Sequence, residues 1–472
     1  MGEGEIIMLY DRLKAYRESD YYGFHMPGHK RNENKFPIGL PYGIDITEIE
    51  GFDDLHHAAG ILKSAEERAS TLYKAEESHF LVNGSTVGIL SAILGVTERG
   101  DKILVARNCH KSVYHAIYMN ELEPIYIYPK YEKDLQINGE ISCKEIEQIL
   151  DKEKDIKAVV IVSPTYDGVV SDVENIAKTV HKHDIPLIVD EAHGAHFGFH
   201  KKFPKNANEK GADIVIHSVH KTLPAMTQTA LIHLNGNRVN RESIGNYLHM
   251  LQSSSPSYVL MASIDYCMDI LEKSGESLFD EYVEEIEQLR QELEELKHLH
   301  IIRTENFDIS KFIISVKDTN MTSGELSRIL LEKYHLQMEM TAGTYVLAMT
   351  TVGDTKEGLQ RLKKAMFEID EELKSEKKVG EDLELPHLPL IYKSAEVLKK
   401  AQKSGLSYVK WEEAEGKVAG EYAYVYPPGI PFLVPGEKIT KEAVRCLKRY
   451  EELQFTIEGI AVEKHIGVWK NG

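Results

Sequence analysis

The chain has 472 residues, enough for two or three domains with a sizeable buried core. Its formal net charge of −19 leaves no cationic excess to release counterions, so a nucleic-acid partner is not expected. No run approaches the roughly 18 consecutive apolar residues of a membrane span. The four cysteines lack a CxxC spacing, which favours reduced thiols in a cytoplasmic protein without membrane association.

The first predicted element is a short helix over residues 6–17, followed by the loop HMPGHK, which begins at His25. The two histidines of this loop suggest a metal site, but no acidic or cysteine ligand follows at a familiar spacing, so no metal is predicted. A helix is predicted over residues 60–73. A strand over residues 80–82 then leads into NGST and an apolar helix.

NGST places Gly84, Ser85 and Thr86 at the start of that helix. Hydroxyls and backbone N–H groups at a helix N-terminus can bind a phosphate. An ordinary helix cap is the alternative interpretation. The next strand, residues 101–106, ends in RNCHKS, so His110 lies where a flat ring could cover a flat cofactor.

Two further apolar runs end in residues with reactive side chains. Residues 187–189 precede Asp190, and residues 214–216 precede a segment that contains Lys221. Strands alternate with helices from residue 80 to 235, which predicts a mostly parallel sheet. Ligands bind outside the carboxyl ends of such strands, so the acid and the lysine should face one crevice. A lysine for a Schiff base and a carboxylate for a ring nitrogen suit a pyridoxal phosphate (PLP) enzyme.

A smaller α+β domain is predicted after a long acidic helical stretch over residues 277–298, whose charges indicate a solvated face. Its strands are expected at 312–316 and 345–350, and its helices at 323–334, 356–373 and 394–403. The proline-rich segment 420–437 is predicted to be a loop without regular structure over much of its length. The expected domains are an N-terminal arm with the HMPGHK loop (1–55), a PLP-binding large domain (56–303) and a C-terminal α+β domain (304–472).

Seven motifs in this order, HMPGHK, NGST, RNCHKS, TYDG, DEAHGAH, SVHKT and YPPGIP, make the chain resemble a known family. It is similar to the bacterial PLP-dependent ornithine/lysine/arginine decarboxylases of fold type I, over about residues 9–437. HMPGHK begins at residue 25, so the resemblance is to the compact form without an N-terminal wing domain. A homodimer or higher homo-oligomer is expected, and ring assembly is not.

The resemblance implies roles for individual residues. Lys221 corresponds to the Schiff-base lysine, Asp190 to the partner of the pyridine nitrogen and His110 to the histidine stacked on the cofactor ring. His193 lies beside the cofactor, where some relatives carry tryptophan. The expected phosphate-binding set is Gly84, Ser85, Thr86, Ser218 and His220. The expected substrate-binding set is Glu421, Thr165, Asp167 and His25, with Glu421 near the distal cation.

The implied reaction is decarboxylation of a basic amino acid, with arginine slightly preferred over lysine or ornithine by analogy. Lys221 or a nearby histidine would return a proton to Cα. Aminotransfer and β-elimination are alternatives. Aminotransferases resemble one another in clamping the α-carboxylate with an arginine of the small domain. The arginines beyond residue 310 all fall in charged helical patterns, which favours decarboxylation: Arg328, Arg361, Arg445 and Arg449.

Two other classes of function are also considered. A non-catalytic PLP-binding protein remains an alternative, although nothing resembles an appended DNA-binding domain. A metal hydrolase built on HGAH or HSVH would leave Lys221 and NGST without a role.

Overall fold

The computed structural model describes residues 8–19, 39–376, 384, 386–426, 430–452 and 456–470. The chain divides into two compact units, the first from Met1–Val96 and Pro186–Asp280 and the second from Thr97–Ile185 and Glu281–Gly472. The HMPGHK motif and His25 lie outside the described residues. No helix of the described part is long and apolar enough to cross a membrane.

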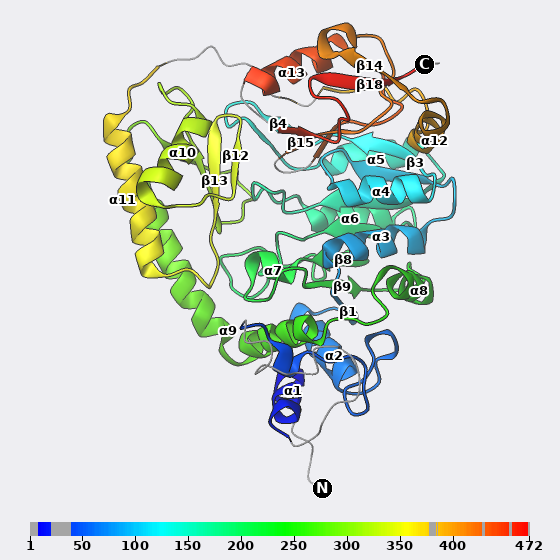
Figure 1. The fold of residues 1–472 in the computed structure, drawn as a ribbon, viewed down its shortest axis with the longest axis vertical. Helices are drawn as coiled ribbons and strands as arrows, with labels where there is room; N and C mark the ends of the chain where they lie inside the picture. Colours follow the sequence, from blue (N-terminus) through cyan, green and yellow to red (C-terminus); the bar gives the residue numbers. More distant parts are fainter. Residues whose placement is uncertain are drawn as a thin grey trace. The chain divides into compact units, whose positions relative to one another are not determined.

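The first unit contains four strands that pair in the order β1-β9-β8-β7 (Figure 1). Their bounds are β1 Glu77–Leu81, β7 Leu187–Asp190, β8 Ile214–His217 and β9 Ala230–Leu234. β7 and β8 run parallel, whereas β9 is antiparallel to both β8 and β1. The carboxyl ends of β7 and β8 therefore meet at one edge, as the sequence predicts.

The three helices predicted in this unit are confirmed within a few residues, as α1 Leu9–Glu18, α2 Ile61–Tyr73 and α3 Gly84–Val96. Four further helical segments were not predicted: η1 Tyr42–Ile44, η2 Leu55–His57, α7 Val219–Thr222 and α8 Arg241–Leu251. A Cβ on Gly88 of α3 would lie 2.7 Å from Leu81 Cδ1 and 3.3 Å from Ile216 Cγ2. Glycine at this position therefore lets α3 pack closely on the face of the sheet to which Ile216 points.

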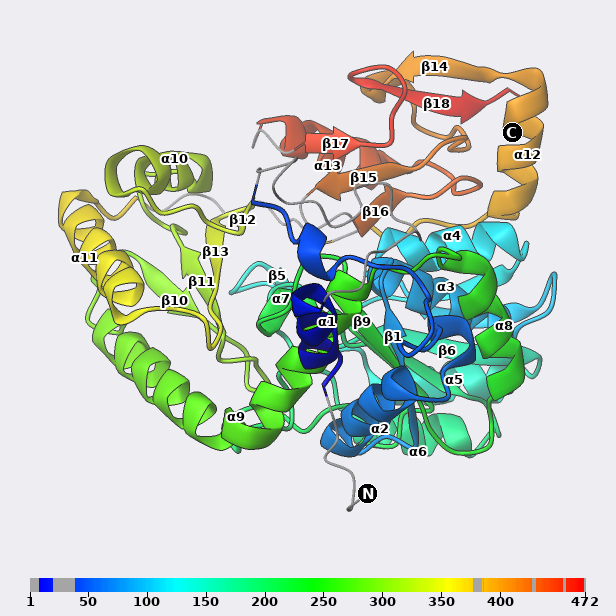
Figure 2. The same ribbon diagram turned by 60° about the horizontal axis from the view of Figure 1, so that its bottom comes forward.

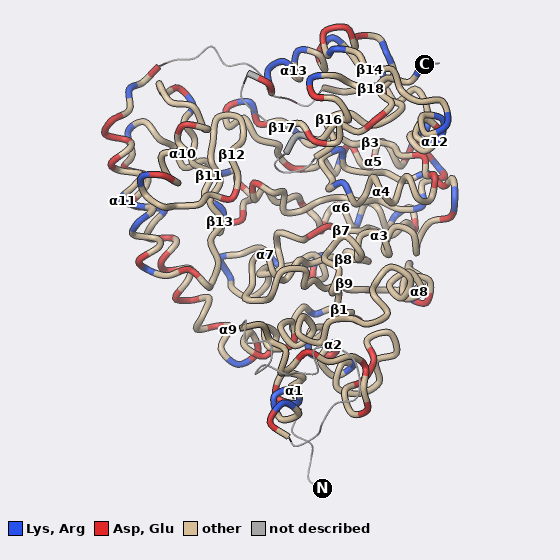
Figure 3. Tube along the Cα trace, viewed as in Figure 1, with Lys and Arg blue, Asp and Glu red and all other residues tan. Residues whose placement is uncertain are grey.

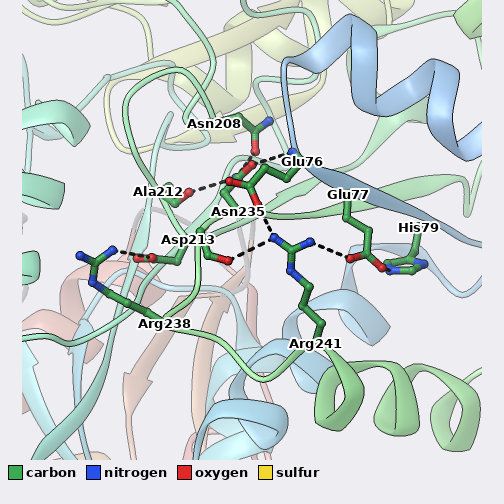
Figure 4. Close-up of polar contacts among 10 residues, drawn as sticks. Glu76, Glu77, His79, Asn208, Ala212, Asp213, Asn235, Arg238 and Arg241 are labelled. Atoms are coloured by element: carbon green, nitrogen blue, oxygen red, sulfur yellow. Dashed lines mark hydrogen bonds and ion pairs between the residues drawn. The ribbon is translucent and has the colours of Figure 1, made fainter.

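A polar cluster fixes the opposite edge of the sheet, where β7 and β8 begin (Figure 4). Arg241, the first residue of α8, donates hydrogen bonds to Glu76 and, at 3.1 Å, to Glu77 Oε2. Asp213 Oδ2 accepts a 2.8 Å hydrogen bond from the Leu187 N–H at the start of β7. These contacts hold the strand starts in place, at the edge away from Asp190 and α7.

The second unit opens with three parallel strands in the order β6-β2-β3. Their bounds are β2 Lys102–Ala106, β3 Glu123–Ile127 and β6 Ile156–Val162, and the helices between and after them are α4 Lys111–Met119, α5 Cys143–Lys152 and α6 Val173–His181. A short hairpin, β4 Tyr131–Glu132 and β5 Ile137–Asn138, precedes α5. The strand–helix alternation that the sequence predicts is present.

The predicted α+β region contains an antiparallel sheet in the order β10-β11-β13-β12, with α10 and α11 on one face (Figures 1 and 2). The bounds are β10 His300–Ile302, β11 Lys311–Ser315, α10 Ser323–Tyr334, β12 Met340–Ala342, β13 Tyr345–Met349 and α11 Lys356–Glu372. Thr322 and Glu325 form a capping box that starts α10. The helix predicted over 277–298 is longer than expected, because α9 extends from Tyr258 to Leu293.

Most charged residues of α11 and of the second half of α9 are solvated, as the sequence predicts, but Arg290 and Asp370 are buried. Figure 3 shows Lys, Arg, Asp and Glu along α11 and the second half of α9. One of the ion pairs between them joins Lys363 and Glu292, whose side chains are both partly exposed, at 2.8 Å. Such pairs contribute little to stability, about 1 kcal/mol or less.

The prediction that 420–437 lacks regular structure over much of its length is only partly correct. The segment contains β15 Ala423–Tyr426 and β16 Ile430–Leu433, which pair with β17 Thr456–Glu458 in the order β16-β15-β17. Proline lacks the N–H that a central strand needs, but Pro431 lies in β16, an edge strand, where that loss is tolerated. The other C-terminal elements are α12 Ser394–Ser404, β14 Leu406–Lys410, η3 Trp411–Glu413, α13 Lys441–Glu452 and β18 His465–Trp469.

Candidate active site

Lys221 lies at the carboxyl edge of the first unit's sheet. β8 ends at His217, and the chain turns at once into the short helix α7, so the lysine sits in a helix rather than directly on the strand end. The lysine Nζ lies 3.0 Å from Nε2 of His193, which belongs to the loop after β7. The structure therefore brings together an amine and an imidazole, as the sequence suggests, and a proton can pass between them.

Asp190 is the last residue of β7 and is directly opposite Ile216 of β8. The residue is 4% exposed, and its Oδ1 accepts a 3.1 Å hydrogen bond from the Ala192 N–H. Burial raises the pKa of Asp190, and the positive charge of Lys221 acts in the opposite direction. A cationic group that approaches this carboxylate would therefore find a strongly attracting partner.

A group of hydroxyls lies at the N-terminus of α3. The Ser85 hydroxyl, in the first turn of α3, hydrogen-bonds with the buried hydroxyl of Ser218, and Thr86 beside it is exposed. Gly84 has φ of +73°, a conformation that glycine adopts without strain. The first-turn N–H groups of an α-helix have no partner within the helix. Hydroxyl donors and a helix N-terminus fit a phosphate group.

His220 adjoins this group from α7. Its Nδ1 lies 2.8 Å from the carbonyl oxygen of Thr229, so Nδ1 carries the proton and donates. Burial lowers the pKa of His220, the hydrogen bond opposes that shift, and nearby Lys221 adds to it. The ring is therefore held neutral, with its orientation fixed by the backbone.

The remaining described site residues belong to the second unit. His110 caps α4: its Nδ1 accepts a 3.3 Å hydrogen bond from the Ser112 N–H and lies 2.9 Å from the Ser112 hydroxyl. An Nδ1 that accepts places the proton of the neutral ring on Nε2. The cap fixes the direction in which this imidazole points.

Arg107, three residues before His110, is almost fully buried and anchors the β15–β16 hairpin. Its guanidinium donates hydrogen bonds to the carbonyl oxygens of Pro431, at 2.5 Å, and Phe432, at 3.1 Å. It also pairs with the buried Glu437 at 3.2 Å. A planar guanidinium with several donors suits such a multiple contact better than a lysine would.

The TYDG residues Thr165 and Asp167 are buried, and both side chains are hydrogen-bonded within the unit. Asp167 Oδ1 accepts a 2.5 Å hydrogen bond from the Tyr345 hydroxyl of β13, and Thr165 Oγ1 accepts one of 3.1 Å from the Val169 N–H. Burial raises the pKa of Asp167 to about 6, against the effect of the tyrosine hydrogen bond. Asp167 therefore joins the loop after β6 to the antiparallel sheet, whereas Thr165 stabilises the turn within that loop.

We expect Asp167 to make stability pH-dependent. Its folded-state pKa is raised to about 6, so its stabilising contribution is complete below the unfolded pKa of about 4 and is lost as pH rises through 6. The loss is on the order of 3 kcal/mol, since one pKa unit corresponds to about 1.4 kcal/mol. Asp167→Asn should remove this fall, as measured by urea unfolding from pH 4 to pH 8.

A second variant checks the assignment. Tyr345→Phe removes the hydrogen bond that favours the ionised carboxylate, so the fall in stability should move to higher pH. If the unfolding free energies of wild type and Asp167→Asn run parallel over the whole range, Asp167 is not the titrating group.

Glu421 lies just before β15 and is half-buried. Its Oε1 accepts a 2.7 Å hydrogen bond from the Gly467 N–H, and its Oε2 accepts one of 3.3 Å from the Ala461 N–H. Burial raises the pKa of Glu421, and the two backbone hydrogen bonds oppose that shift. The carboxylate is therefore partly desolvated and oriented by the backbone.

The sequence analysis missed a buried polar chain in the first unit, which joins Ser78, His233, His217 and Glu191. Part of the signal was present, because two apolar strands each carry a single histidine among their hydrophobic residues: IVIH and ALIHL. Only the pairing of the strands shows that these residues meet.

Comparison with known proteins gives matches over most of the chain. Residues 8–335 match the family model described as Orn/Lys/Arg decarboxylase, major domain, and residues 384–470 match Orn/Lys/Arg decarboxylase, C-terminal domain. An uncharacterised protein of Bacillus subtilis, YaaO, is 37% identical over 96% of this chain and 95% of its own length. The arginine decarboxylase of Bacillus anthracis is 31% identical over 96% of this chain and 94% of its own.

Solved structures show the same fold. The constitutive lysine decarboxylase of Escherichia coli has a TM-score of 0.84 at 20% identity, covering 98% of this chain and 82% of that chain. The lysine decarboxylase LdcF of Francisella novicida has a TM-score of 0.81 at 21% identity, covering 98% and 80%. The expected fold type I architecture is confirmed by these neighbours.

Proposed function

Since the chain belongs to the Orn/Lys/Arg decarboxylase family, a PLP-dependent carboxy-lyase family acting on basic amino acids, we propose that its preferred substrate is arginine. Support comes from relatives of nearly the same length named arginine decarboxylase, in Bacillus anthracis and Bacillus subtilis. The wider alternative within the family is lysine or ornithine, which differ from arginine only at the distal end.

The observation that carries the proposal is the placement of Lys221, His193 and Asp190 at one sheet edge. PLP, when bound, supplies an electron-withdrawing ring that accepts the electron pair left as CO2 departs. Lys221 is the amine that would hold the cofactor covalently. Asp190 would hold a proton on the ring nitrogen through its negative charge. Lys221 or His193 would return a proton to Cα, since the two side chains are in contact.

The donor set also fits the cofactor's phosphate. Ser85 and Ser218 already contact each other, and Thr86 and the N–H groups at the start of α3 add further donors. Gly84 precedes them with a positive φ. His220 would lie beside this group as a neutral ring. All of these residues belong to the first unit, as Lys221 and Asp190 do.

Aminotransfer is less well supported than decarboxylation. All four arginines beyond residue 310 lie in helices of the second unit, as the sequence predicts: Arg328 in α10, Arg361 in α11, and Arg445 and Arg449 in α13. Strand β13 carries none. An arginine clamp on the α-carboxylate would stabilise the group that must leave, and a decarboxylase has reason to lack it.

For the remaining predicted site residues the proposal rests on the family resemblance. His110 would cover the cofactor ring, and His25, Thr165 and Asp167 would contribute to the substrate side. The present contacts of Asp167 and Thr165 favour a supporting role, in which they hold the loop after β6 in place.

The function is tested by CO2 release from arginine, lysine and ornithine, together with the visible absorbance of the purified protein. We expect a visible band that borohydride abolishes, and the highest kcat/KM with arginine. A protein without the band, or one that releases no CO2 from any of the three, would contradict the proposal.

We expect Glu421→Gln to weaken recognition of the substrate's distal cation. A partly desolvated charge pair lost in this way typically costs about 2–5 kcal/mol, so kcat/KM should fall at least about 30-fold, mainly through KM. PLP absorbance should not change. The matched control is Glu413→Gln, which alters an exposed glutamate of the same unit.

The same variant distinguishes a structural role of Glu421 from a role in substrate recognition. Glutamine cannot accept from both the Gly467 and the Ala461 N–H, so lower stability with an unchanged KM would mean that the carboxylate only ties β18 to the preceding loop. In that case Glu421 does not recognise substrate.

We also propose that the enzyme is a cytoplasmic homodimer or higher homo-oligomer. All four cysteines are free thiols, which supports a reducing compartment. Light scattering after size exclusion would measure the assembly, and a monomer that is fully active would contradict this part.

A further inference from the structure

Four side chains form an unbroken hydrogen-bonded chain on one face of the β1-β9-β8-β7 sheet. Glu191 Oε2 lies 2.7 Å from His217 Nε2, and His217 Nδ1 lies 3.0 Å from His233 Nε2. His233 Nδ1 lies 2.6 Å from the Ser78 hydroxyl. All four residues are at most 1% exposed, so water does not interrupt the chain. None of them has a role in the reaction as described above.

The chain lies on the back of the sheet relative to Asp190. Asp190 and Ile216 are register partners and share a face, and Ile216 points toward α3. Successive residues of a strand alternate between faces, so His217 points to the opposite side. Glu191 follows Asp190 and meets His217 there. Two members of the hydrogen-bonded chain are therefore backbone neighbours of candidate site residues. Glu191 follows Asp190, and His217 precedes Ser218.

The chain also anchors the loop that carries His193. Glu191 Oε2 accepts a second hydrogen bond, of 2.9 Å, from the Ala207 N–H, and the Glu191 carbonyl accepts one of 2.8 Å from the Gly194 N–H. The Tyr73 hydroxyl donates to the Ala195 carbonyl oxygen at 2.7 Å. His193 lies between these anchors, so the position of its ring against Lys221 depends on them.

Tyr73 connects the loop that carries His193 to the hydrogen-bonded chain of side chains. Its ring packs against the imidazoles of His217 and His233, with centroids 4.7 Å and 4.8 Å away. The Tyr73 ring therefore packs against both histidines, and its hydroxyl is hydrogen-bonded to the His193 loop.

The protonation state of Glu191 decides in which direction the donors of this hydrogen-bonded chain point. If Glu191 is ionised, His217 Nε2–H donates to it, His233 Nε2–H donates to His217 Nδ1, and Ser78 donates to His233 Nδ1. If Glu191 is protonated, its hydroxyl donates to His217 Nε2, His217 Nδ1–H donates to His233, and His233 Nδ1–H donates to Ser78. Both histidines are neutral in either state but change tautomer together, and the net charge is −1 or 0.

The surroundings favour the neutral state. Burial raises the pKa of Glu191, against its hydrogen bond from Ala207 and the charges of Lys210 and His196. Burial lowers the pKa of His217, with His196 adding to the effect, and it lowers that of His233, with His217 and His79 adding. Both shifts disfavour a buried ion pair of carboxylate and imidazolium. Tyr73, the other titratable group in contact, also has its pKa raised by burial, with Cys267 and Glu191 adding to the effect.

We propose that Glu191 and His217 are positioning residues for the Lys221–His193 contact, and that the proton they share holds the His193 loop in its productive position. This inference rests on the proposed function, in which Lys221 carries the cofactor. Loss of the proton at alkaline pH reverses the chain and weakens the reaction without weakening substrate binding.

Glu191→Gln tests the proposal because glutamine fixes one direction. Glu191 Oε2 contacts both the Ala207 N–H and His217, so the amide must place its oxygen there and accept from both. His217 is then forced into the Nε2–H tautomer, which the wild type adopts only when Glu191 is ionised. The matched control is Glu66→Gln, since Glu66 is also buried, accepts from the Phe80 N–H and lies near a histidine of the same unit.

The holoenzyme is measured in two ways. Nitrogen-15 spectroscopy of the histidine rings should show His217 and His233 neutral from pH 6 to 9 and changing tautomer together in the wild type, but fixed in Glu191→Gln. In the variant, kcat for arginine at pH 7 should fall about fivefold while KM stays within about twofold, the pattern expected when a transition-state contact is weakened. The decrease in kcat that we expect for the wild type at alkaline pH should be absent in the variant. Glu66→Gln should lower stability alone.

The outcomes are distinct. If the wild type shows neither a visible band nor CO2 release, the proposed function fails. If it is active but Glu191→Gln has the wild-type kcat and pH profile, or if Glu66→Gln lowers kcat equally, the inference fails. Should Glu191→Gln not fold, the wild-type spectra still decide, because a charged imidazolium or independent tautomers would overturn it.

Discussion

Lys221→Ala is expected to abolish the visible band of the holoenzyme and to lower kcat/KM by roughly 10³-fold or more, the scale of losing a covalent catalytic residue. The lysine is the amine at the carboxyl edge of the β7–β8 pair, in contact with His193. Alanine removes the covalent link and a proton donor together, so added PLP should not restore turnover.

The measurement combines absorbance, borohydride reduction followed by intact mass, and CO2 release. Lys205→Ala, at an exposed lysine of the same unit, controls for general effects of charge removal. A Lys221→Ala protein that still gains the mass of a reduced cofactor, or that retains near-normal turnover, would remove the central assignment.

Asp190→Asn should leave the covalent attachment of the cofactor intact but impair CO2 release. Asparagine is nearly the same shape but carries no charge, so it cannot hold a proton on the ring nitrogen. The loss of one preorganised electrostatic contact at a buried site costs about 3–4 kcal/mol, which corresponds to about 10²–10³-fold in kcat. Because Asp190 is buried, water cannot substitute for the missing charge.

The comparison to make is the absorbance of the borohydride-sensitive visible band against the rate of CO2 release in the same preparation. Asp213→Asn is the matched control, because Asp213 is a buried acid at the other edge of the same sheet. Normal CO2 release from Asp190→Asn would contradict the assigned role even if cofactor affinity fell.

The sequence predicted the site best where function depends on local order along the chain. Lys221 and Asp190 follow apolar, β-branched runs, and parallel pairing of those runs brings their ends together whatever the details of packing. The segment from Gly84 to Thr86 was likewise placed correctly at a helix start, because glycine and hydroxyl residues favour that position.

The sequence failed where the outcome depends on partners distant along the chain. Proline argues against a central strand, but nothing local shows that β16 would lie at a sheet edge. The chain from Ser78 to Glu191 likewise depends on the register of four strands. The contact between Asp167 and Tyr345 spans 178 residues, so the TYDG motif alone could not reveal it.

The way Arg107 holds the β15–β16 hairpin has a consequence for redesign. Arg107 donates to the main-chain carbonyls of Pro431 and Phe432 and does not bond their side chains. These hydrogen bonds therefore do not depend on which residues occupy β16. The chemical surface of the hairpin can therefore vary between relatives while its anchor stays constant. A redesign of the hairpin could therefore vary its side chains and leave Arg107 and Glu437 untouched.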